Sequence, residues 1–372
     1  MKNQVYQAAL AGLLHDVGKI EQRALNVVRK SAPGFEGEGQ PAHATYSAYF
    51  VQTNVPQPYQ ASALAGAYHH APEKSPAENK HLSKLIALAD KLSAGERADD
   101  FTKAQNPPRQ MISIFERISL KEPRIDKTEK DWNFVRLRPL ALQDKTIFPG
   151  LKQDKDGEGE GYQKLLEVLT SAAKKDTGDI QSYVENLLGA LQTAAWCVPS
   201  AYYYNTPDVS LYDHSRMTAA LAVCLAGLSE REIDSLSSAV SNDFHGKATT
   251  ENQTLLAKPV VLLVGGDISG IQKFIYTISS KKAAQTLRGR SFYLELLTEA
   301  VLRYVLNELG LPYTNVIYSG GGHFFLLAPL DAQHKFADIR RQVTQKILAH
   351  HGTSLYLALG CAEVPASGFK AG

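Results

Sequence analysis

Residues 8–20 read AALAGLLHDVGKI, an alanine- and leucine-rich run that ends in the adjacent pair His15 and Asp16. The run predicts a buried helix, and residues 3–30 together are expected to be helical. A neutral imidazole nitrogen and a carboxylate oxygen are ligands for divalent metals such as Mn, Fe, Co, Ni or Zn. Adjacent residues on a helix point about 100° apart, so this pair can serve neighbouring or shared metals. The stretch therefore indicates half of a metal site.

Three histidines follow the pair within the first 70 residues. His43 opens a helix expected to run to about Gln52, and His69 and His70 end a small-residue helix that begins at Tyr59. Each histidine alone is more often a capping or core side chain, but in this order they indicate metal ligands. Because two successive residues of a regular helix cannot face one metal, His69 and His70 either serve different metals or one supports a ligand.

Asp90 adds a second carboxylate to this set. It follows the apolar residues 85–89 within a helix expected over residues 81–93. An unpaired carboxylate is expensive to bury in such a segment, so Asp90 needs a partner. Metal ligation would satisfy it, and an ion pair with Lys91 or Arg97 is the alternative.

The order of these chemical groups resembles that of the HD phosphohydrolase superfamily, all-helical enzymes that hold one or two metals and hydrolyse phosphodiesters or phosphomonoesters. In that family a histidine on an Ala-rich helix normally precedes the His-Asp pair, yet no histidine precedes position 15. His214, just before a helix expected over residues 217–228, is the candidate for the missing ligand. The resemblance therefore implies a circularly permuted HD domain.

Length and composition describe a multidomain globular protein. A chain of 372 residues is too long for one ordinary core and predicts two or three domains. With 44% hydrophobic and 21% charged residues it falls in the globular class. The formal net charge of +2 carries no overall nucleic-acid signature, so any such binding must come from local patches.

The three cysteines, Cys197, Cys224 and Cys361, are far apart and form no Cys-x-x-Cys motif. This spacing favours a reducing compartment and argues against a zinc ribbon or a disulfide framework. The N-terminal apolar run is short and is interrupted by His15 and Asp16, so a cleavable signal is not expected. No stretch approaches membrane-spanning length. We therefore expect a cytoplasmic protein without a membrane partner.

The middle of the chain is less informative. Residues 111–120 predict a strand or a short helix, residues 132–142 a strand pair, and residues 154–161 a flexible charged loop, whereas residues 182–196 predict an amphipathic helix. The expected organisation is an HD-type helical domain over 1–100, a poorly defined connection over 101–180, a helical segment completing the permuted domain over 181–240, a polar linker over 241–257, and a last domain over 258–372.

From residue 258 the hydrophobic pattern predicts alternating strands and helices. The expected elements, in order, are a strand over 259–266, a helical stretch over 268–310 with a break near Gly289, strands over 315–319 and 324–328, a helix over 332–350 and a strand over 354–361. The order βαββαβ predicts a ferredoxin-like fold, which is also the palm of nucleotidyl cyclases and many polymerases. The fold class is therefore multidomain α+β.

Four motifs carry a second and more specific resemblance. They are DVSLYDH at 208–214, GDISGIQKFIY at 266–276, LRGRSFYLEL at 287–296 and SGGGHF at 319–324. Together with the permuted HD domain they resemble the large subunit of type III-A (Csm) CRISPR effector complexes, over nearly all of the chain. That subunit continues into a second palm with a Gly-Gly-Asp-Asp turn and a helical C-terminal domain, so a chain ending at Gly372 is expected to be an N-terminal fragment or split half.

The resemblance implies partners and an activity. It implies that single-stranded DNA is the HD substrate, that bound target RNA activates cleavage, and that the guide-RNA-containing complex includes a guide 5'-handle-binding subunit and a small subunit. Two metals, of the kinds Mn, Ni, Co or Mg, would activate a water that attacks phosphorus in line. Asp16 is the natural bridging ligand, and His15 and Asp16 form the catalytic pair. Lys19 either contacts phosphate or is a solvated helix end.

The palm motifs predict nucleotide binding without catalysis. Two-metal nucleotidyl transfer needs carboxylates both at the end of the first strand and at the hairpin turn. This chain has Asp267 at the first place and only glycines followed by His323 at the second. The family pairs this palm with the second one to make cyclic oligoadenylate from ATP. By match to the motif, the ATP-binding candidates are Asp267, Ser269, Gly270, Gly321 and Gly322, with a structural hairpin as the alternative.

One dense basic cluster could bind phosphates of guide RNA or ATP, or could be a solvated helix face. It consists of Lys281, Lys282, Arg288 and Arg290.

Two further hypotheses for the whole chain compete with a metal-dependent nuclease. One is a scaffold with a vestigial HD site that docks guide-RNA-binding subunits. The other, a free-standing HD nucleotide phosphohydrolase, would not need the palm. The retained histidines and aspartates favour the nuclease.

Overall fold

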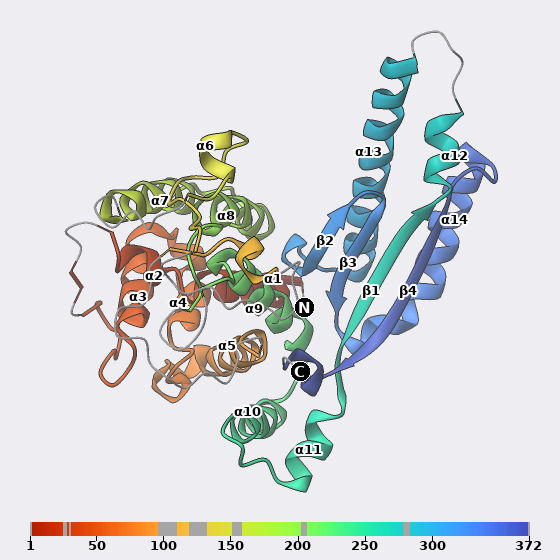
Figure 1. Cartoon of the computed structure of the whole chain (residues 1–372). Coiled ribbons are helices and arrows are strands. Elements are labelled where there is room, and N and C mark those ends of the chain that lie inside the picture. Colours follow the sequence, from red (N-terminus) through yellow and green to blue (C-terminus); the bar gives the residue numbers. More distant parts are fainter. Residues whose placement is uncertain are drawn as a thin grey trace.

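The computed structural model describes residues 2–24, 28–29, 31–95, 110–118, 132–150, 158–201, 207–277 and 283–370. The described residues form a helical part and an antiparallel sheet that is covered on one face by two long helices (Figure 1). The multidomain α+β prediction is therefore confirmed. Among the described helices, none is long and apolar enough to cross a membrane.

The first five helices of the helical part carry or flank six of the seven predicted ligands. They are α1 (Lys2–Leu14), α2 (Gly18–Glu21), α3 (Ala42–Asn54), α4 (Gln57–Ala67) and α5 (Lys80–Ser93). The helices that follow are α6 (Asp144–Ile147), α7 (Glu158–Ala173), α8 (Ile180–Ala195), α9 (Leu211–Leu225), α10 (Glu230–Phe244) and α11 (Thr250–Leu256). Helix α1 is apolar on most of its surface and lies in the middle, in contact with α4, α5, α8 and α9.

Helix α9 reaches the centre of this body from far along the chain. It packs against both α1 and α5, where small residues let the backbones approach closely. A Cβ atom added at Gly12 of α1 would lie 2.5 Å from the Cα atom of Ala219 on α9. The predicted permutation of the HD domain is confirmed, because α9 completes a helical core that begins with α1.

The C-terminal part is a four-stranded antiparallel sheet in the order β2-β3-β1-β4. Its elements are β1 (Pro259–Ser269), α12 (Ile271–Tyr276), α13 (Ala283–Leu309), β2 (Val316–Gly320), β3 (His323–Ala328), α14 (Phe336–His351) and β4 (Tyr356–Pro365). Alternate residues such as Leu262 and Val264 are buried against the helices, whereas Phe325 and Ala358 lie on the exposed face. The ferredoxin-like prediction is confirmed.

The helix predicted over residues 3–30 is interrupted, and this part of the prediction was wrong. Helix α1 ends at Leu14, and a turn precedes the short α2. The cause is the close approach of α3: a Cβ atom at Gly18 would lie 2.2 Å from the carbonyl oxygen of His43. The Gly18 N–H also donates to the Ser47 hydroxyl at 2.9 Å, and that hydroxyl donates to the His15 carbonyl. A continuous helix would not allow this packing.

Two boundaries in the second half also differ from expectation. The polar linker at 241–257 is largely helical, because Ser229 and Thr249 are N-caps with capping boxes and open α10 and α11. Helix α13 runs through Gly289 without a break, since one exposed glycine costs a helix only about 1 kcal/mol. Instead, α12 and α13 are separated by the segment between Tyr276 and Ala283.

Before α7 begins at Glu158, the described residues of the connecting region, 110–118 and 132–150, contain little regular structure. A short 3-10 helix spans Ile114–Arg117, and Phe134 makes single bridges to Ile112 and Gly150 in place of the expected strand pair. The prediction of a charged loop over 154–161 was wrong for residues 158–161, because α7 begins at Glu158. Residues 154–157 lie outside the described part of the chain.

The helical part and the sheet are joined mainly through α9. Helix α9 contacts β1 and β3, and the Arg216 guanidinium donates to the Val316 carbonyl at 3.1 Å. The buried side chain of Asn315 donates to the carbonyls of Ala220 at 3.4 Å and of Leu327 at 2.9 Å. The same helix therefore belongs to the core of both parts.

The contact between α1 and α9 makes a prediction about stability. Replacing Gly12 with alanine should lower the free energy of unfolding by ~1–3 kcal/mol, because the added methyl group meets backbone atoms that cannot move aside. Gly189→Ala on α8 is the matched control, because nothing lies within 4 Å of its added Cβ. It should be neutral or raise the melting temperature. Equal melting temperatures for the two variants would contradict the tight contact.

Candidate metal centre

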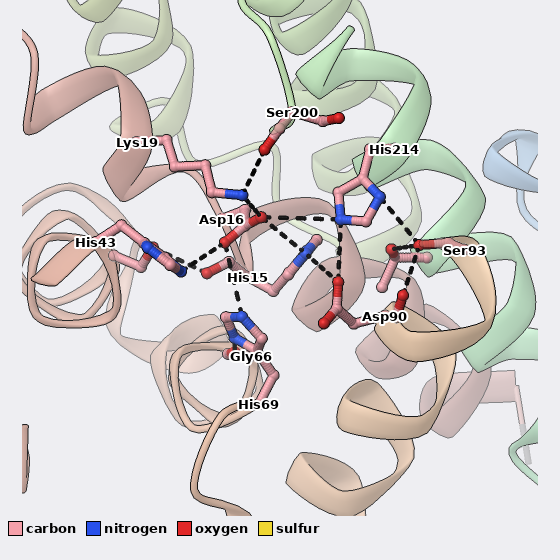
Figure 2. Close-up of polar contacts among 12 residues, drawn as sticks. His15, Asp16, Lys19, His43, Gly66, His69, Asp90, Ser93, Ser200 and His214 are labelled. Atoms are coloured by element: carbon pink, nitrogen blue, oxygen red, sulfur yellow. Dashed lines mark hydrogen bonds and ion pairs between the residues drawn. The ribbon is translucent and has the colours of Figure 1, made fainter. Parts of the chain in front are cut away.

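The seven polar residues predicted as ligands come from five places in the helical part and form two adjoining groups. Figure 2 labels all of them except His70. His15 and Asp16 lie in the turn after α1, and His69 and His70 lie in the turn after α4. Three others lie within helices: His43 near the start of α3, Asp90 near the end of α5 and His214 in the first turns of α9. These residues are far apart in the sequence but close in space, because α1, α4, α5 and α9 pack together.

One group of ligands gathers around one oxygen of Asp16. The Oδ1 atom lies 3.1 Å from Nε2 of His43 and 3.6 Å from Nε2 of His69. The Nε2 atoms of His43 and His70 are 2.9 Å apart. One potential ligand atom from each of Asp16, His43, His69 and His70 lies within 4.8 Å of all the others.

A second group gathers around the other oxygen of Asp16. The Oδ2 atom lies 3.4 Å from Nε2 of His15 and 3.8 Å from Nε2 of His214. Asp90 Oδ1 lies 3.0 Å from Nε2 of His214 and 3.6 Å from Nε2 of His15. Because each oxygen of Asp16 faces a different group, this carboxylate is placed to bridge two cations.

The donor set fits divalent metal ions. Nε2 of His15 and Oδ1 of Asp16 are buried and make no hydrogen bond within the described part of the chain. Buried polar atoms without partners cost free energy, and a cation between them would satisfy both. Nδ1 of His15 lies 2.7 Å from the Gly12 carbonyl and Nδ1 of His69 lies 2.8 Å from the Gly66 carbonyl. These carbonyls keep the proton on Nδ1, so each Nε2 lone pair is directed at the centre.

The electrostatics of the cluster also suit a cation. Burial opposes ionisation of Asp16, but Lys19 and His15 hold the pKa of its carboxyl well below the usual range. Burial lowers the pKa of His70 to about 4, with a contribution from His43, and also lowers the pKa of His69. Burial disfavours charge on His15, yet Asp16 and Asp90 outweigh it and raise its pKa to about 9. The two carboxylates thus favour a positive charge at His15, which a metal ion would supply in place of the proton. The neutral imidazoles of His69 and His70 complete a donor set typical of transition metals.

Three alternatives for these residues can now be judged. Lys19 is not a solvated helix end, because its Nζ donates to Asp16 Oδ2 at 2.5 Å and to the Ser200 carbonyl at 2.8 Å. Lys91 does not pair with Asp90, since it donates to two serines of α10, and Arg97 lies outside the described residues. Two successive residues of a regular helix could not face one metal, but this limit does not apply to His69 and His70, because both lie in the turn after α4.

The palm candidates lie around the end of β1 and the β2–β3 turn. Asp267 is opposite His323 in the register, and its Oδ1 lies 2.8 Å from Nδ1 of His323. The Ser269 hydroxyl donates to Asp267 Oδ2 at 3.1 Å. Gly321 and Gly322 form the turn with φ of 62° and 87°. Asp267 and His323 line a shallow depression of about 500 Å³ on the exposed face of the sheet.

Two of the remaining candidates have structural explanations. Gly270 has a φ of 92°, and a Cβ there would lie 2.1 Å from the Ser354 carbonyl oxygen, so the turn itself requires glycine. Arg290 donates to the Phe274 carbonyl and lies over the Phe274 ring, which ties α13 to α12. Arg288 is exposed on α13, and Lys281 and Lys282 lie outside the described residues.

The sequence analysis did not anticipate the residues that support the ligands. Ser47 fixes the turn that carries the His-Asp pair, and the Ser93 hydroxyl lies 3.1 Å from Nδ1 of His214. No spacing rule distinguishes such serines from other buried ones. The only local signal is that Ser93 follows Asp90 by one helical turn.

Comparisons with known proteins agree with this architecture. The family model of the HD domain matches residues 3–95, and that of the Csm1 subunit domain B matches residues 260–372. A single-strand-specific deoxyribonuclease Cas10/Csm1 of subtype III-A from Methanocaldococcus jannaschii is 28% identical over 99% of this chain and 46% of its own length. The chain thus spans about half the length of the curated relatives it matches.

Solved structures show the same likeness. A crystal structure of Csm1 from T. onnurineus has a TM-score of 0.70 and 25% identity, covering 99% of this chain and 46% of that one. A Csm1-Csm4 cassette in complex with one ATP has a TM-score of 0.65 and 25% identity, covering 98% of this chain and 45% of that one.

Fold and site together define the class: a permuted HD domain with a two-part metal-ligand cluster, followed by a palm domain. Within that class, the resemblance to the N-terminal part of the type III-A large subunit, Cas10/Csm1, is confirmed over nearly the whole chain.

The two-group geometry makes a prediction about metal content. Asp16→Asn should weaken binding of both Mn²⁺ ions, because Asp16 contributes an oxygen to each group, whereas Asp90→Asn should weaken only one. Metal per chain after equilibrium dialysis measures this. Asp338→Asn, at an exposed residue of α14, is the control and should bind as the wild type does. Equal losses in the Asp16 and Asp90 variants would contradict a bridging carboxylate.

Proposed function

We propose that this chain is the N-terminal part of the large subunit of an RNA-guided type III CRISPR interference complex, and that its HD domain is a metal-dependent single-stranded DNA nuclease. The observation that carries the proposal is the convergence of five histidines and Asp90 around the carboxylate of Asp16; all seven residues except the exposed His70 are buried or half-buried. A vestigial scaffold site would be expected to have lost some of these ligands.

The proposed roles follow from the geometry. The metal ligands are His15, Asp16, His43, His69, His70, Asp90 and His214, with His15 and Asp16 as the catalytic pair. Two divalent ions held by these residues would lower the pKa of a bound water and neutralise charge on the phosphate. The metal identity, Mn, Ni, Co or Mg, is part of the proposal. Lys19, which reaches Asp16 from the rim of the cluster, is within range of a phosphate bound there.

Asp16 does two things in this proposal. It holds both ligand groups at a constant separation, and its buried charge attracts the cations that the histidines alone would bind more weakly. The Gly12 and Gly66 carbonyls orient His15 and His69, so these rings lose little conformational freedom when they bind. The site is thereby organised before substrate arrives.

We propose that the palm binds ATP through Asp267, Ser269, Gly270, Gly321 and Gly322, without metal-dependent catalysis of its own. Cyclic oligoadenylate synthesis would require the second palm. The support is the open depression beside Asp267 and the similar Csm1-Csm4 cassette described with one ATP. Arg288, together with Lys281 and Lys282, stays a candidate for phosphate contacts, whereas Arg290 is engaged with Phe274.

The partners and the domain division belong to the same proposal. We propose that a Csm4-like, guide 5'-handle-binding subunit, a small subunit and target RNA act with this chain, as the similar cassette suggests for the first of them. The HD domain would comprise residues 1–100 and 181–240 and the palm residues 258–372, with 101–180 inserted between the two HD segments. A reducing cytoplasmic location is inferred from the unpaired cysteines.

The test of the nuclease proposal is cleavage of end-labelled single-stranded DNA by this chain with Mn²⁺, Ni²⁺ or Mg²⁺. We expect metal-dependent cleavage that chelation stops and that Asp16→Ala reduces to background, with duplex DNA cut poorly. Asp338→Ala should cut as the wild type does. Cleavage that survives Asp16→Ala would contradict the proposed site, and absence of cleavage both alone and with the partner subunits would favour a scaffold.

The palm proposal has its own prediction. Gly321→Ala should weaken ATP binding on the order of tenfold, about 1.4 kcal/mol, because a side chain enters the space offered to the nucleotide. Gly310→Ala is the control, since that glycine also has a positive φ and open surroundings but ends α13 away from the β2–β3 turn. Binding of a fluorescent ATP analogue measures both. Equal affinities would argue that the glycine turn is only structural.

A further inference from the structure

Ser93, the last residue of α5, lies behind the second group of ligands. Its buried hydroxyl is 3.1 Å from Nδ1 of His214, 2.7 Å from the Thr218 hydroxyl and 3.1 Å from the Asp90 carbonyl. Figure 2 shows Ser93 on the side of the His214 ring that faces away from Asp16. Ser93 therefore contacts a ligand without contacting the centre itself.

The hydrogen atoms of this contact can be assigned. A serine hydroxyl has one hydrogen, and Ser93 donates it to the Asp90 carbonyl, as serines near helix ends commonly do. Its lone pairs then accept from the Thr218 hydroxyl and from Nδ1–H of His214. The Nε2 atom of His214 faces Asp90 at 3.0 Å and Asp16 at 3.8 Å, and a metal ion held among these three residues would take its lone pair.

His214 differs from the other oriented histidines in what holds it. The Nδ1 atoms of His15 and His69 face carbonyls three residues earlier in their own segments. His214 instead depends on a side chain from a helix that lies 121 positions earlier in the chain. Its orientation therefore depends on the packing of α9 against α5, which the permutation of the domain makes necessary.

We propose that Ser93 is a positioning residue for the metal centre: it fixes the tautomer and the orientation of His214, and Thr218 holds Ser93 in place. The inference rests on the proposed metal-dependent function and adds a residue to it. Removing the hydroxyl removes the 3.1 Å contact at Nδ1 of this buried imidazole and lets the ring adopt the other tautomer or turn away. Loss of such a supporting hydrogen bond costs metal affinity about 10–100-fold.

The test is calorimetric titration of Mn²⁺ into the metal-free full chain. Ser93→Ala should weaken the ion held by His15, Asp90 and His214 by about 10–100-fold and leave the other ion unchanged. Ser83→Ala is the matched control, because Ser83 is also a buried serine of α5 and donates to another hydroxyl, that of Ser75, at 2.8 Å. It should leave both affinities unchanged.

Thr218 supplies a second pair of variants if Ser93→Ala folds poorly. Thr218→Val keeps the shape but removes the hydroxyl that donates to Ser93, so it should weaken the same ion by a smaller factor. Thr218→Ser keeps the hydroxyl and should restore wild-type affinity, which a purely structural role of the methyl group would not produce.

The outcomes separate this inference from the function on which it rests. Two Mn²⁺ ions bound with wild-type affinity by Ser93→Ala would overturn the positioning role alone. An equal loss for both ions, or a similar loss in Ser83→Ala, would also overturn it, because the effect would then be general. A wild-type chain that binds no Mn²⁺ would overturn the metal centre itself, together with the role assigned to Ser93.

Discussion

The arrangement of the helical part depends on compensating the buried charge of the Asp16 carboxylate. This carboxylate is almost inaccessible to solvent and is surrounded by imidazoles and one lysine. A charge buried in this way is tolerable only when cations or hydrogen-bond donors compensate for it. The close packing of α1 against α4 and α9 brings those groups together, which links the stability of the fold to the chemistry of the site.

Helix α9 connects that site to the palm. One end of the helix carries His214, and its side contacts the first and third strands of the sheet. Arg216 and the buried Asn315 reinforce this contact by bonding to backbone carbonyls across the junction. A movement of the sheet that carries α9 with it would therefore displace a proposed metal ligand, so the two proposed activities share a structural element.

In the palm, the strand register decides which side chain lies opposite Asp267. The register that places Asp267 opposite His323 puts a histidine where a metal-dependent palm would need a carboxylate. The carboxylate is thus paired with an imidazole at 2.8 Å on an exposed face. In the described part of this turn, His323 occupies the position where two-metal transfer would require a second acidic ligand.

The sequence by itself determined the seven candidate ligand residues and the βαββαβ pattern, because ligand chemistry and hydrophobic periodicity are local properties. It failed where a boundary or a contact depended on distant packing. The helix break after Leu14 exists because α3 approaches Gly18. The predicted linker over 241–257 contains the end of α10 and all of α11, whose N-caps are Ser229 and Thr249. Only the tertiary structure decided which ligands share an oxygen of Asp16, that Lys19 is paired, that Arg290 is engaged with Phe274, and that Ser93 supports His214. These features join residues far apart in the chain, and their distances are set by how helices pack rather than by any local pattern.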